Sequence, residues 1–369
     1  MPQPRVAIAH DYLTQRGGAE RVVLALSRAF PEATIYTTLY NPDTTYPDFR
    51  DARIVTSWLN RVPLFRRDHR LAMPLLAAAS NSLSIDADVV IASSSGWAHG
   101  FPTTGRKLVY CHTPARYLYL SDEYLGRPAR SSLQGLGLLA LRPWLIRWDR
   151  RAAASADGYL SNSRVVQQRI RSVYGIDAEV LPPPHGLDAD GPQEAPAQLA
   201  DWESSGYFLV VSRLLPYKNV QQVIEAFRGL PDQRLVVVGR GPMAEELRSQ
   251  APVTVRLAQD LSDGELRWTY AHATALVAAS YEDFGLAPLE AGAFGRPTLA
   301  LRAGGFLDTV VEGVNGVFFD QATPDALSAA VRRVLDLDWD PSAIRAHTAQ
   351  FAEPRFAARI RGLVGRMTA

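Results

Sequence analysis

The chain has 369 residues, of which 47% are hydrophobic and 21% are charged, a composition typical of globular proteins and not of disordered chains. This length exceeds that of one ordinary hydrophobic core and predicts two domains. The net charge of +1 excludes a general attraction to nucleic acid, so a bound anion must be held by local groups.

The sequence also bears on where the protein works. A single cysteine, Cys111, excludes an internal disulfide and suits a reducing cytoplasm. Residues 5–9 form too short an apolar stretch for a secretory signal peptide. The longest apolar candidate, residues 133–146, is interrupted by Arg142 and Pro143, whereas a membrane span needs roughly 20 apolar residues. We therefore expect a cytoplasmic protein, either soluble or peripheral on the inner face of the membrane.

The N-terminal half alternates strands and helices, the pattern of a parallel sheet. Strands are predicted at residues 5–9, 88–92, 107–111 and 158–161. Gly17 and Gly18 lie between the first strand and a helix, where backbone N–H groups favour an anion; the alternative is a simple turn. His10 and Asp11 end the same strand and are candidates for substrate contact, with a loop-holding role as the alternative for Asp11.

Two further strand ends carry polar groups, residues 93–100 and the segment CHTPARYLY from Cys111 to Tyr119. A lone histidine is more often structural than catalytic. His112, however, directly follows a predicted strand, at the edge where open α/β sheets bind ligands, which favours a functional role. Arg116 and Tyr117 are weaker candidates for acceptor binding.

Two stretches mix arginines with apolar residues. Residues 59–79 and 138–151 contain Arg61, Arg66, Arg67, Arg70, Arg142, Arg147, Arg150 and Arg151, with Trp144 and Trp148. Such a pattern suits a helix on an anionic lipid surface. It equally suits a helix with a solvated basic face, and the sequence leaves both interpretations open.

A domain boundary is predicted at three consecutive prolines, Pro182, Pro183 and Pro184, because proline cannot continue a sheet and the polar residues after them lack periodicity. We expect an N-terminal domain of residues 1–182, a second domain of residues 183–354, and a terminal helix at residues 355–369.

Three predicted strands of the second half end in chemically active side chains. Strand 207–212 precedes Arg213 and Lys218, strand 234–239 runs into the turn at Gly239 and Arg240, and strand 273–279 precedes Glu282 and Glu290. Because Gly285 and Pro288 lie between the two glutamates, they cannot share one helix face. The strand ends predict a ligand crevice, and the helix that begins near Pro288 favours a phosphate.

These pairs, with the loop at Gly17 and Gly18, resemble the retaining glycosyltransferases of family 4. Their GT-B fold has two facing Rossmann-like α/β domains with parallel sheets and a cleft between them. The CHTPARYLY segment is similar to bacterial GDP-mannose-dependent mannosyltransferases. The resemblance implies an N-terminal acceptor domain, a C-terminal nucleotide-sugar donor domain, and a last helix that crosses back to the first.

The resemblance implies metal-independent hexose transfer without a cofactor, in cell-surface polysaccharide synthesis. GDP-mannose is the favoured donor, and a lipid-linked or other glycan the acceptor. The implied catalytic residues are His112, Arg213, Lys218 and Glu282. The implied donor-binding residues are Gly17, Gly18, Gly239, Arg240, Leu261, Phe284, Gly285, Leu286 and Glu290. Glu290 would bind ribose hydroxyls, whereas Glu282 and His112 would contact the transferred sugar.

Several alternatives stay open. Gln259, Arg240 and Asp308 depart from the common pattern of the family, which leaves a UDP-sugar donor possible. A phosphorylase, an epimerase or a non-catalytic sugar-nucleotide binding protein would use the same fold. A metal site is not expected, because none of the pairs Asp86/Asp88, Asp188/Asp190 and Asp336/Asp338 follows a strand beside a glycine turn. The sequence also lacks a P-loop, which argues against an NTPase.

Overall fold

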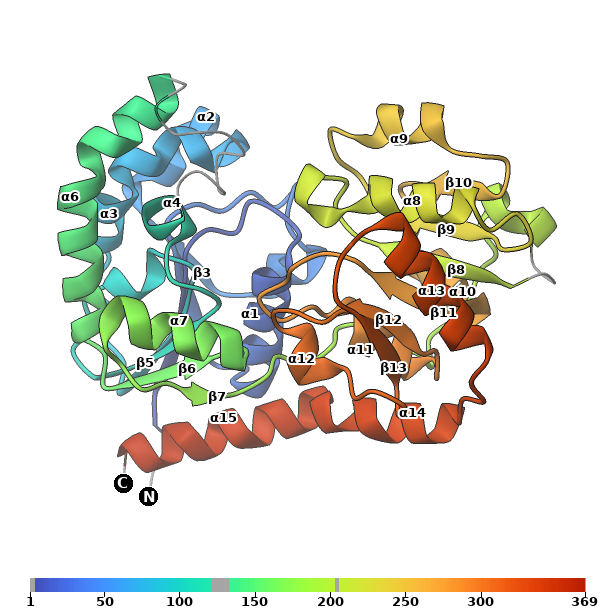
Figure 1. The fold of residues 1–369 in the computed structure, drawn as a ribbon. Coiled ribbons are helices and arrows are strands. Elements are labelled where there is room, and N and C mark those ends of the chain that lie inside the picture. The colour runs from blue at the N-terminus through green and yellow to red at the C-terminus, as the bar shows by residue number, and fades with distance from the viewer. Residues whose placement is uncertain (1–3, 121–129, 131–132, 203–205, 369) are drawn as a thin grey trace. The chain divides into compact units, whose positions relative to one another are not determined.

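The computed structural model describes residues 4–120, 130, 133–202 and 206–368, and the chain forms two compact units. Unit 1 contains Met1–Pro184 and Glu353–Ala369, and unit 2 contains His185–Ala352. The chain therefore passes into unit 2 after Pro184 and returns to unit 1 after Ala352 (Figure 1).

Unit 1 is built on a seven-stranded parallel sheet in the order β3-β2-β1-β4-β5-β6-β7. Its strands are β1 (Val6–His10), β2 (Thr34–Thr37), β3 (Ile54–Thr56), β4 (Val89–Ser94), β5 (Arg106–Cys111), β6 (Gly158–Ser161) and β7 (Glu179–Val180). The four predicted strands are present. Strands β2, β3 and β7 were not predicted, because they have two to four residues and most of their positions are half-buried or exposed. The order changes direction between β1 and β4, where open α/β sheets bind ligands.

The terminal helix α15 (Glu353–Thr368) packs in unit 1 beside α1 (Gly18–Ala29). Phe356, Ile360 and Val364 recur every four residues and are buried in the same core cluster as Leu26 of α1. The Phe356 ring also lies edge-on to Tyr110 of β5, with 5.9 Å between the ring centroids. The apolar stripe of α15 thus completes the core of unit 1.

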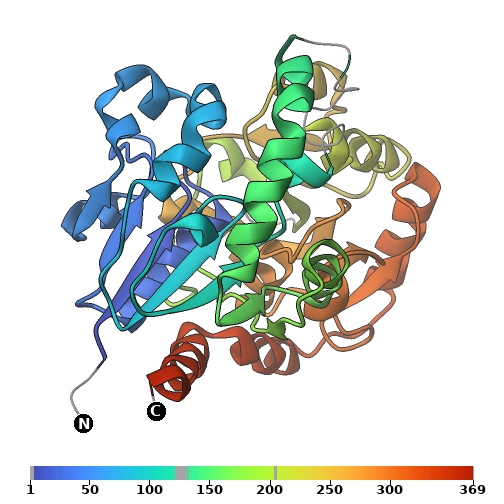
Figure 2. The ribbon, with the colours of Figure 1, turned by 90° about the vertical axis from the view of Figure 1, so that its left-hand side faces the viewer.

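The remaining elements of unit 1 cover the sheet. They are α2 (Pro63–Arg67), α3 (Met73–Asn81), α4 (Arg116–Tyr119), α6 (Leu133–Ala154) and α7 (Arg164–Tyr174), with 3-10 turns η1 (Pro47–Asp51), η2 (Trp58–Arg61), η3 (His69–Ala72) and η4 (Ala98–Gly100). Figure 2 shows α6 as the long green helix that crosses unit 1. Pro143 lies inside this helix, where it lacks the N–H that would bond the preceding turn.

A buried polar cluster holds α6 to the rest of unit 1. Asp149 of α6 is fully buried, with Oδ1 3.0 Å from Nε2 of His99. The Tyr119 hydroxyl donates to the other carboxylate oxygen at 2.7 Å. Burial, together with the charge of Asp149, raises the pKa of Tyr119 well above its usual value, so this hydroxyl stays a donor. His99 and Tyr119 thus provide polar partners for both oxygens of this buried carboxylate, which offsets the cost of burying it.

Unit 2 has a six-stranded parallel sheet in the order β10-β9-β8-β11-β12-β13. Its strands are β8 (Tyr207–Val211), β9 (Leu235–Val238), β10 (Val255–Ala258), β11 (Ala273–Ala278), β12 (Thr298–Leu301) and β13 (Gly316–Phe319). This is the Rossmann order, with its change of direction between β8 and β11. The strands predicted at 207–212, 234–239 and 273–279 are present.

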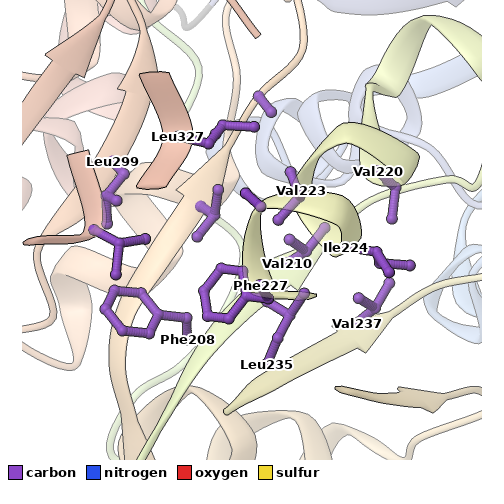
Figure 3. Packing of buried hydrophobic residues seen from close by; sticks show 14 of the residues in the cluster. Phe208, Val210, Val220, Val223, Ile224, Phe227, Leu235, Val237, Leu299 and Leu327 are labelled. Atoms are coloured by element: carbon purple, nitrogen blue, oxygen red, sulfur yellow. The ribbon is translucent and has the colours of Figure 1, made fainter. Parts of the chain in front are cut away.

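Helices cover both faces of this sheet. They are α8 (Val220–Arg228), α9 (Ala244–Gln250), α10 (Asp263–His272), α11 (Ala287–Ala293), α12 (Phe306–Thr309), α13 (Pro324–Leu335) and α14 (Pro341–Thr348), with 3-10 turns η6 (Ala197–Trp202), η7 (Pro216–Lys218) and η8 (Ala349–Phe351). Figure 3 shows one core, in which Val223 and Phe227 of α8 pack on Phe208 and Val210 of β8 and Leu327 of α13 lies nearby. Strands buried on both faces read as continuous apolar runs, which made them predictable.

We expect Asp149→Ala to lower the free energy of unfolding by about 3 kcal/mol, because it leaves the buried His99 and the half-buried Tyr119 without their shared partner. Denaturant titration monitored by tryptophan fluorescence measures this loss. The matched control is Asp86→Ala, which removes an exposed carboxylate paired with Arg5 and is expected to change stability little. Equal effects of the two substitutions would contradict a special role for the buried pair.

Candidate functional site

The carboxyl ends of β8 and β11 place a partly buried ion pair at the point where the strand order of unit 2 changes direction. Lys218 in η7 follows β8, and its Nζ forms an ion pair with Oε1 of Glu282, which follows β11. Ser280 Oγ donates to the same Oε1 at 2.5 Å. These three side chains line a small pocket of about 40 Å³ together with apolar residues of both strands. The site therefore holds a buried cation and a half-buried carboxylate in a fixed arrangement.

Arg213 lies beside this pair on the same loop. Its Nη2 donates to the Tyr217 hydroxyl at 3.2 Å, and the Tyr217 ring centroid lies 5.0 Å from Lys218 Nζ. Asn219 adopts the left-handed conformation, with φ of 57°, and its amide donates to Ala279 O at 2.8 Å. This bond ties the loop that carries both cations to the end of β11.

Glu290 lies in the first turn of α11, as predicted, and is buried. Its Oε2 accepts a hydrogen bond of 2.7 Å from the hydroxyl of Tyr270 in α10, which fixes the orientation of the carboxylate. The predicted anion attraction of this helix is modest, because α11 has only seven residues and Pro288 contributes no N–H. Fixed side-chain charges therefore dominate this part of the site.

The loop of Phe284, Gly285 and Leu286 packs closely against a second glycine pair, Gly304 and Gly305. Gly285 has φ of +83°, and a Cβ there would lie 2.3 Å from the buried ring of Phe306. The N–H of Gly305 donates to Glu282 O at 2.8 Å, and this hydrogen bond fixes the backbone that carries Glu282. The requirement for glycine at residue 285 is thus both conformational and steric.

The loops after β8, β9 and β10 are joined to one another. A Cβ at Gly239 would lie 1.8 Å from Ser212 O, so only glycine permits this approach. Arg240 forms an ion pair with Asp260, next to the half-buried Leu261. The predicted base-binding residues Gly239, Arg240 and Leu261 therefore form one neighbouring surface within unit 2.

In unit 1, Gly17 and Gly18 form the start of α1. Gly17 is the N-cap residue and provides no side-chain cap. Glu20, in the first turn of α1, is buried, and its Oε1 accepts a hydrogen bond of 3.1 Å from Gln15 Nε2. A Cβ at Gly17 would lie 2.5 Å from the other carboxylate oxygen of Glu20, so glycine is needed here for space.

His112 lies directly after β5, and its Nε2 is 2.8 Å from Ser93 Oγ at the end of β4. His10 Nδ1, at the end of β1, lies 3.1 Å from the same hydroxyl. Burial, together with the charge of His10, lowers the pKa of His112 to about 3, so this ring is neutral at neutral pH. Burial alone would lower the pKa of His10, but the adjacent Glu20 and Asp11 carboxylates outweigh it and raise that pKa.

Asp11 and Tyr117 are both buried and contact neighbouring residues of unit 1. Asp11 is buried and accepts from the backbone N–H groups of Ser95, Trp97 and Ala98 at 2.6–2.9 Å. It therefore holds the turn after β4, whereas the loop that the sequence suggested as the alternative was the one at Gly17 and Gly18. Tyr117 is buried and stacks on Trp97 at a centroid distance of 4.8 Å, so its suggested contact with an acceptor is not supported.

The structure thus groups the predicted residues into two sets. Arg213, Lys218, Glu282, Glu290, Gly239, Arg240, Leu261, Phe284, Gly285 and Leu286 belong to unit 2, and Gly17, Gly18 and His112 belong to unit 1. Sequence reasoning missed the partners that orient them, namely Ser93, Glu20, Tyr217, Tyr270 and Ser280. Ser93 and Ser280 do stand at strand ends, which was the available signal.

The aspartate pair nearest the N-terminus has a different role from metal binding. Asp86 and Asp88 both lie within 3.4 Å of the Arg5 guanidinium and are exposed. Within the described residues, no group of three or more His, Cys, Asp or Glu side chains is arranged to hold a metal ion.

Comparison with known proteins identifies the family. The model described as Glycosyltransferase Family 4 matches residues 16–190, and that described as Glycosyl transferases group 1 matches residues 193–351. Together the two models extend over both units. The chain belongs to glycosyltransferase family 4. The recognition made from the sequence motifs is therefore confirmed.

Two named relatives of this glycosyltransferase use GDP-mannose. It is 32% identical over 247 residues to the GDP-mannose-dependent alpha-(1-6)-phosphatidylinositol monomannoside mannosyltransferase of Mycolicibacterium smegmatis, covering 59% of this chain and 58% of the relative. It is 36% identical over 140 residues to a GDP-mannose-dependent alpha-mannosyltransferase of Corynebacterium glutamicum, covering 37% and 33%. A glycogen synthase of Mycobacterium tuberculosis is 31% identical over 222 residues, covering 55% and 49%. The matched part is less than two thirds of each relative.

Solved structures share the fold. Anabaena HepE, solved in complex with UDP-glucose, has a TM-score of 0.71 at 18% identity, covering 98% of this chain and 100% of that one. Sucrose-phosphate synthase of Thermosynechococcus elongatus has a TM-score of 0.69 at 19% identity, covering 98% and 99%. With two parallel sheets flanked by helices, the glycosyltransferase has the predicted GT-B fold.

We expect Gly285→Ala to destabilise the glycosyltransferase by about 2–4 kcal/mol, because the added methyl group meets the Phe306 ring and the positive φ is strained. The matched control is Gly313→Ala, at φ of +79° with no atom within 4 Å of the added Cβ, which is expected to cost about 1 kcal/mol. Denaturant titration of both variants measures the difference. Equal costs would contradict the close packing of the Gly285 loop.

Proposed function

We propose that this chain is a retaining, metal-independent glycosyltransferase that moves mannose from GDP-mannose to a lipid-linked or other glycan acceptor. The observation that carries the proposal is the ion pair between buried Lys218 and half-buried Glu282, beside Arg213, at the carboxyl ends of β8 and β11. In this proposal unit 2 binds the nucleotide sugar and unit 1 binds the acceptor.

The two cations meet the main electrostatic demand of the reaction. Cleavage of the sugar–phosphate bond leaves a nucleoside diphosphate with additional negative charge, which fixed positive groups stabilise in a site that excludes water. Arg213 and Lys218 serve this role, each charge-assisted hydrogen bond contributing roughly 1.5–3 kcal/mol. The amides of Phe284, Gly285 and Leu286, and those of the Gly17–Gly18 loop, add neutral donors.

The ion pair of Lys218 and Glu282 suggests how the contacts in the site change when the donor binds. Without donor, Glu282 neutralises Lys218 in surroundings where an unpaired charge is costly. We propose that the diphosphate replaces Glu282 as the main partner of Lys218. The glutamate, still oriented by Ser280, then accepts hydrogen bonds from hexose hydroxyls.

Glu290 is assigned to the ribose of the donor. A carboxylate accepts hydrogen bonds from two adjacent hydroxyls, and the Tyr270 hydroxyl fixes its orientation before the ligand arrives. The nucleoside base is assigned to the surface of Gly239, Arg240 and Leu261. His112, neutral in its buried surroundings, is assigned to the hydroxyls of the transferred hexose.

The names of the relatives favour mannose as the transferred sugar, since two of them are GDP-mannose-dependent mannosyltransferases. A second candidate is a UDP-sugar transferase. It is favoured by the likeness to Anabaena HepE, which was solved with UDP-glucose, and by the departures from the common family pattern at Gln259 and Arg240.

We expect GDP-mannose to raise the melting temperature by several degrees, because a ligand at about 100 times its Kd stabilises the folded state by about 2.7 kcal/mol. A thermal-shift panel of GDP-mannose, UDP-glucose and ADP-glucose, with EDTA present, measures this directly. If only the UDP-sugar stabilised the protein, GDP-mannose would be the wrong donor and a UDP-sugar would take its place in the proposal. Stabilisation that requires added magnesium or manganese would contradict metal independence.

Substitutions of the proposed site residues test whether sugar transfer depends on them. Arg213→Ala and Glu282→Gln are expected to lower kcat/KM for sugar transfer by at least about 100-fold, since each removes a group that acts on the departing diphosphate or the sugar. The matched control is Arg228→Ala, which removes an exposed arginine paired with Glu225 on α8. Near-normal transfer by both site variants would contradict the assignment.

A lipid-linked acceptor requires access to a membrane surface, and unit 1 has an apolar patch suited to one. The patch consists of exposed residues on or next to the elements η2, α2, η3, α3 and α6, each of which contacts the next one named. Its members are Trp58, Val62, Leu64, Leu71, Leu75, Leu136, Leu141 and Trp144. Exposed Arg61, Arg67, Arg70 and Arg147 lie on the same elements, so we propose that the patch contacts an anionic lipid surface.

Part of the second arginine-rich stretch, residues 138–151, faces inward instead. Arg142 donates to Leu118 O at 2.8 Å, and Trp148 lies against Gly100 and donates to Asn81. Neither side chain belongs to the patch. Along the described residues, no helix combines the length and apolar character needed to cross a bilayer.

We expect the protein to bind vesicles that contain phosphatidylglycerol and to bind pure phosphatidylcholine vesicles at least about tenfold more weakly, because each surface arginine contributes about 1 kcal/mol at an anionic membrane. Replacing Leu64 and Trp144, which are 57% and 52% exposed, by serine should reduce binding. The matched control is Val253→Ser, an exposed apolar residue of unit 2. Vesicle co-sedimentation measures each case, and equal loss in all variants would contradict the patch.

A further inference from the structure

Three side chains from adjacent strands form a buried hydrogen-bonded chain that ends at His112. The register of the sheet pairs His10 of β1 with Ser93 of β4, and His112 N continues the ladder by donating to Ser94 O at 2.9 Å. Ser93, His10 and His112 are all buried. Because side-chain positions follow from strand register, the three groups are held in place by the sheet itself.

A carbonyl group determines which nitrogen of His10 carries a hydrogen. His10 Nδ1 lies 3.0 Å from Ser93 O, and a carbonyl oxygen can only accept, so Nδ1 of His10 carries a hydrogen. The same N–H also lies 3.1 Å from Ser93 Oγ, which therefore accepts from His10. Glu20 Oε1, 4.0 Å from His10 Nε2, favours the protonated ring.

The hydroxyl proton of Ser93 then has one acceptor. His112 Nε2 lies 2.8 Å from Ser93 Oγ, and within the described part of the chain no other side-chain acceptor lies within hydrogen-bond distance of this hydroxyl. A neutral imidazole carries its hydrogen on one nitrogen and accepts at the other. A bond donated to Nε2 therefore places the remaining hydrogen of His112 on Nδ1.

We propose that Ser93 and His10 are positioning residues that fix the tautomer of His112, with the Ser93 hydroxyl donating to Nε2 and the ring hydrogen held on Nδ1. His112 then offers a donor, and not an acceptor, to a substrate hydroxyl or ring oxygen. Its role toward the transferred sugar rests on the proposed function, whereas the tautomer is a property of the unliganded protein.

NMR spectroscopy tests the tautomer without any substrate. The chain has seven histidines, so long-range ¹H–¹⁵N spectra of protein with labelled histidine are sparse, and His112→Gln identifies the signal. We expect a pyrrole-type Nδ1 and a pyridine-type Nε2 at neutral pH. In Ser93→Ala the ring should shift toward the Nε2–H tautomer. The control Ser94→Ala, which removes a neighbouring hydroxyl bonded to Asp11 and Gly96, should leave the signal unchanged.

Two further variants keep the test decisive if Ser93→Ala does not fold. Ser93→Thr keeps a hydroxyl and should retain the wild-type tautomer. His10→Leu removes the donor to Ser93 Oγ and should give a mixture of tautomers, whereas His10→Asn keeps a side-chain N–H. A wild-type ring protonated on Nε2, or a spectrum unaffected by Ser93→Ala and His10→Leu, would overturn the proposal.

Kinetics provide the second readout. Ser93→Ala should lower kcat by about 10-fold or more while KM for the donor changes by less than about twofold, and Ser93→Thr should restore kcat. Unchanged kcat in Ser93→Ala, with transfer lost in His112→Ala, would overturn the positioning role. Normal transfer by His112→Ala would instead contradict the proposed function of His112, while the NMR result still decides whether Ser93 sets its tautomer.

Discussion

Both units depend on one constraint, which is that parallel strands end at the same edge of their sheet. In each unit the strand order changes direction once, between β1 and β4 or between β8 and β11, so the flanking helices leave that edge open. Side chains far apart in sequence meet there because the strands that precede them are neighbours. Lys218 and Glu282 are an example, separated by 64 residues and joined in one ion pair.

Burial of charge is the second organising feature. The Lys218–Glu282 pair, the Asp149–His99 contact and the Glu20–His10 contact each place a carboxylate beside a basic group in a largely buried position. An isolated charge in such a position is unfavourable, so each pair holds its elements in one arrangement. The pairs have different roles. The Lys218–Glu282 pair lies at an open strand end, whereas the Asp149–His99 contact holds α6 against the rest of unit 1.

Much of the fold was predictable because its central strands are buried on both faces and appear as continuous apolar runs. Strands β1, β4, β5, β6, β8, β9 and β11 were found in this way. The short outer strands β2 and β3 contain threonines and half-exposed residues, which do not differ from a loop in sequence. The arginine-rich stretches were read less well, because Arg142 and Trp148 face inward for reasons of packing that no periodicity reveals.

By itself the sequence determined the class of fold, the family, and the groups at the strand ends, since residue type and spacing along one strand–loop–helix segment are local properties. Only the tertiary structure decided which of those groups touch. Tyr270 and Glu290 come from different helices, and His10, Ser93 and His112 lie in or directly after three different strands. Their contacts depend on the register and order of strands, which are fixed by packing over the whole sheet and leave no signal within one segment.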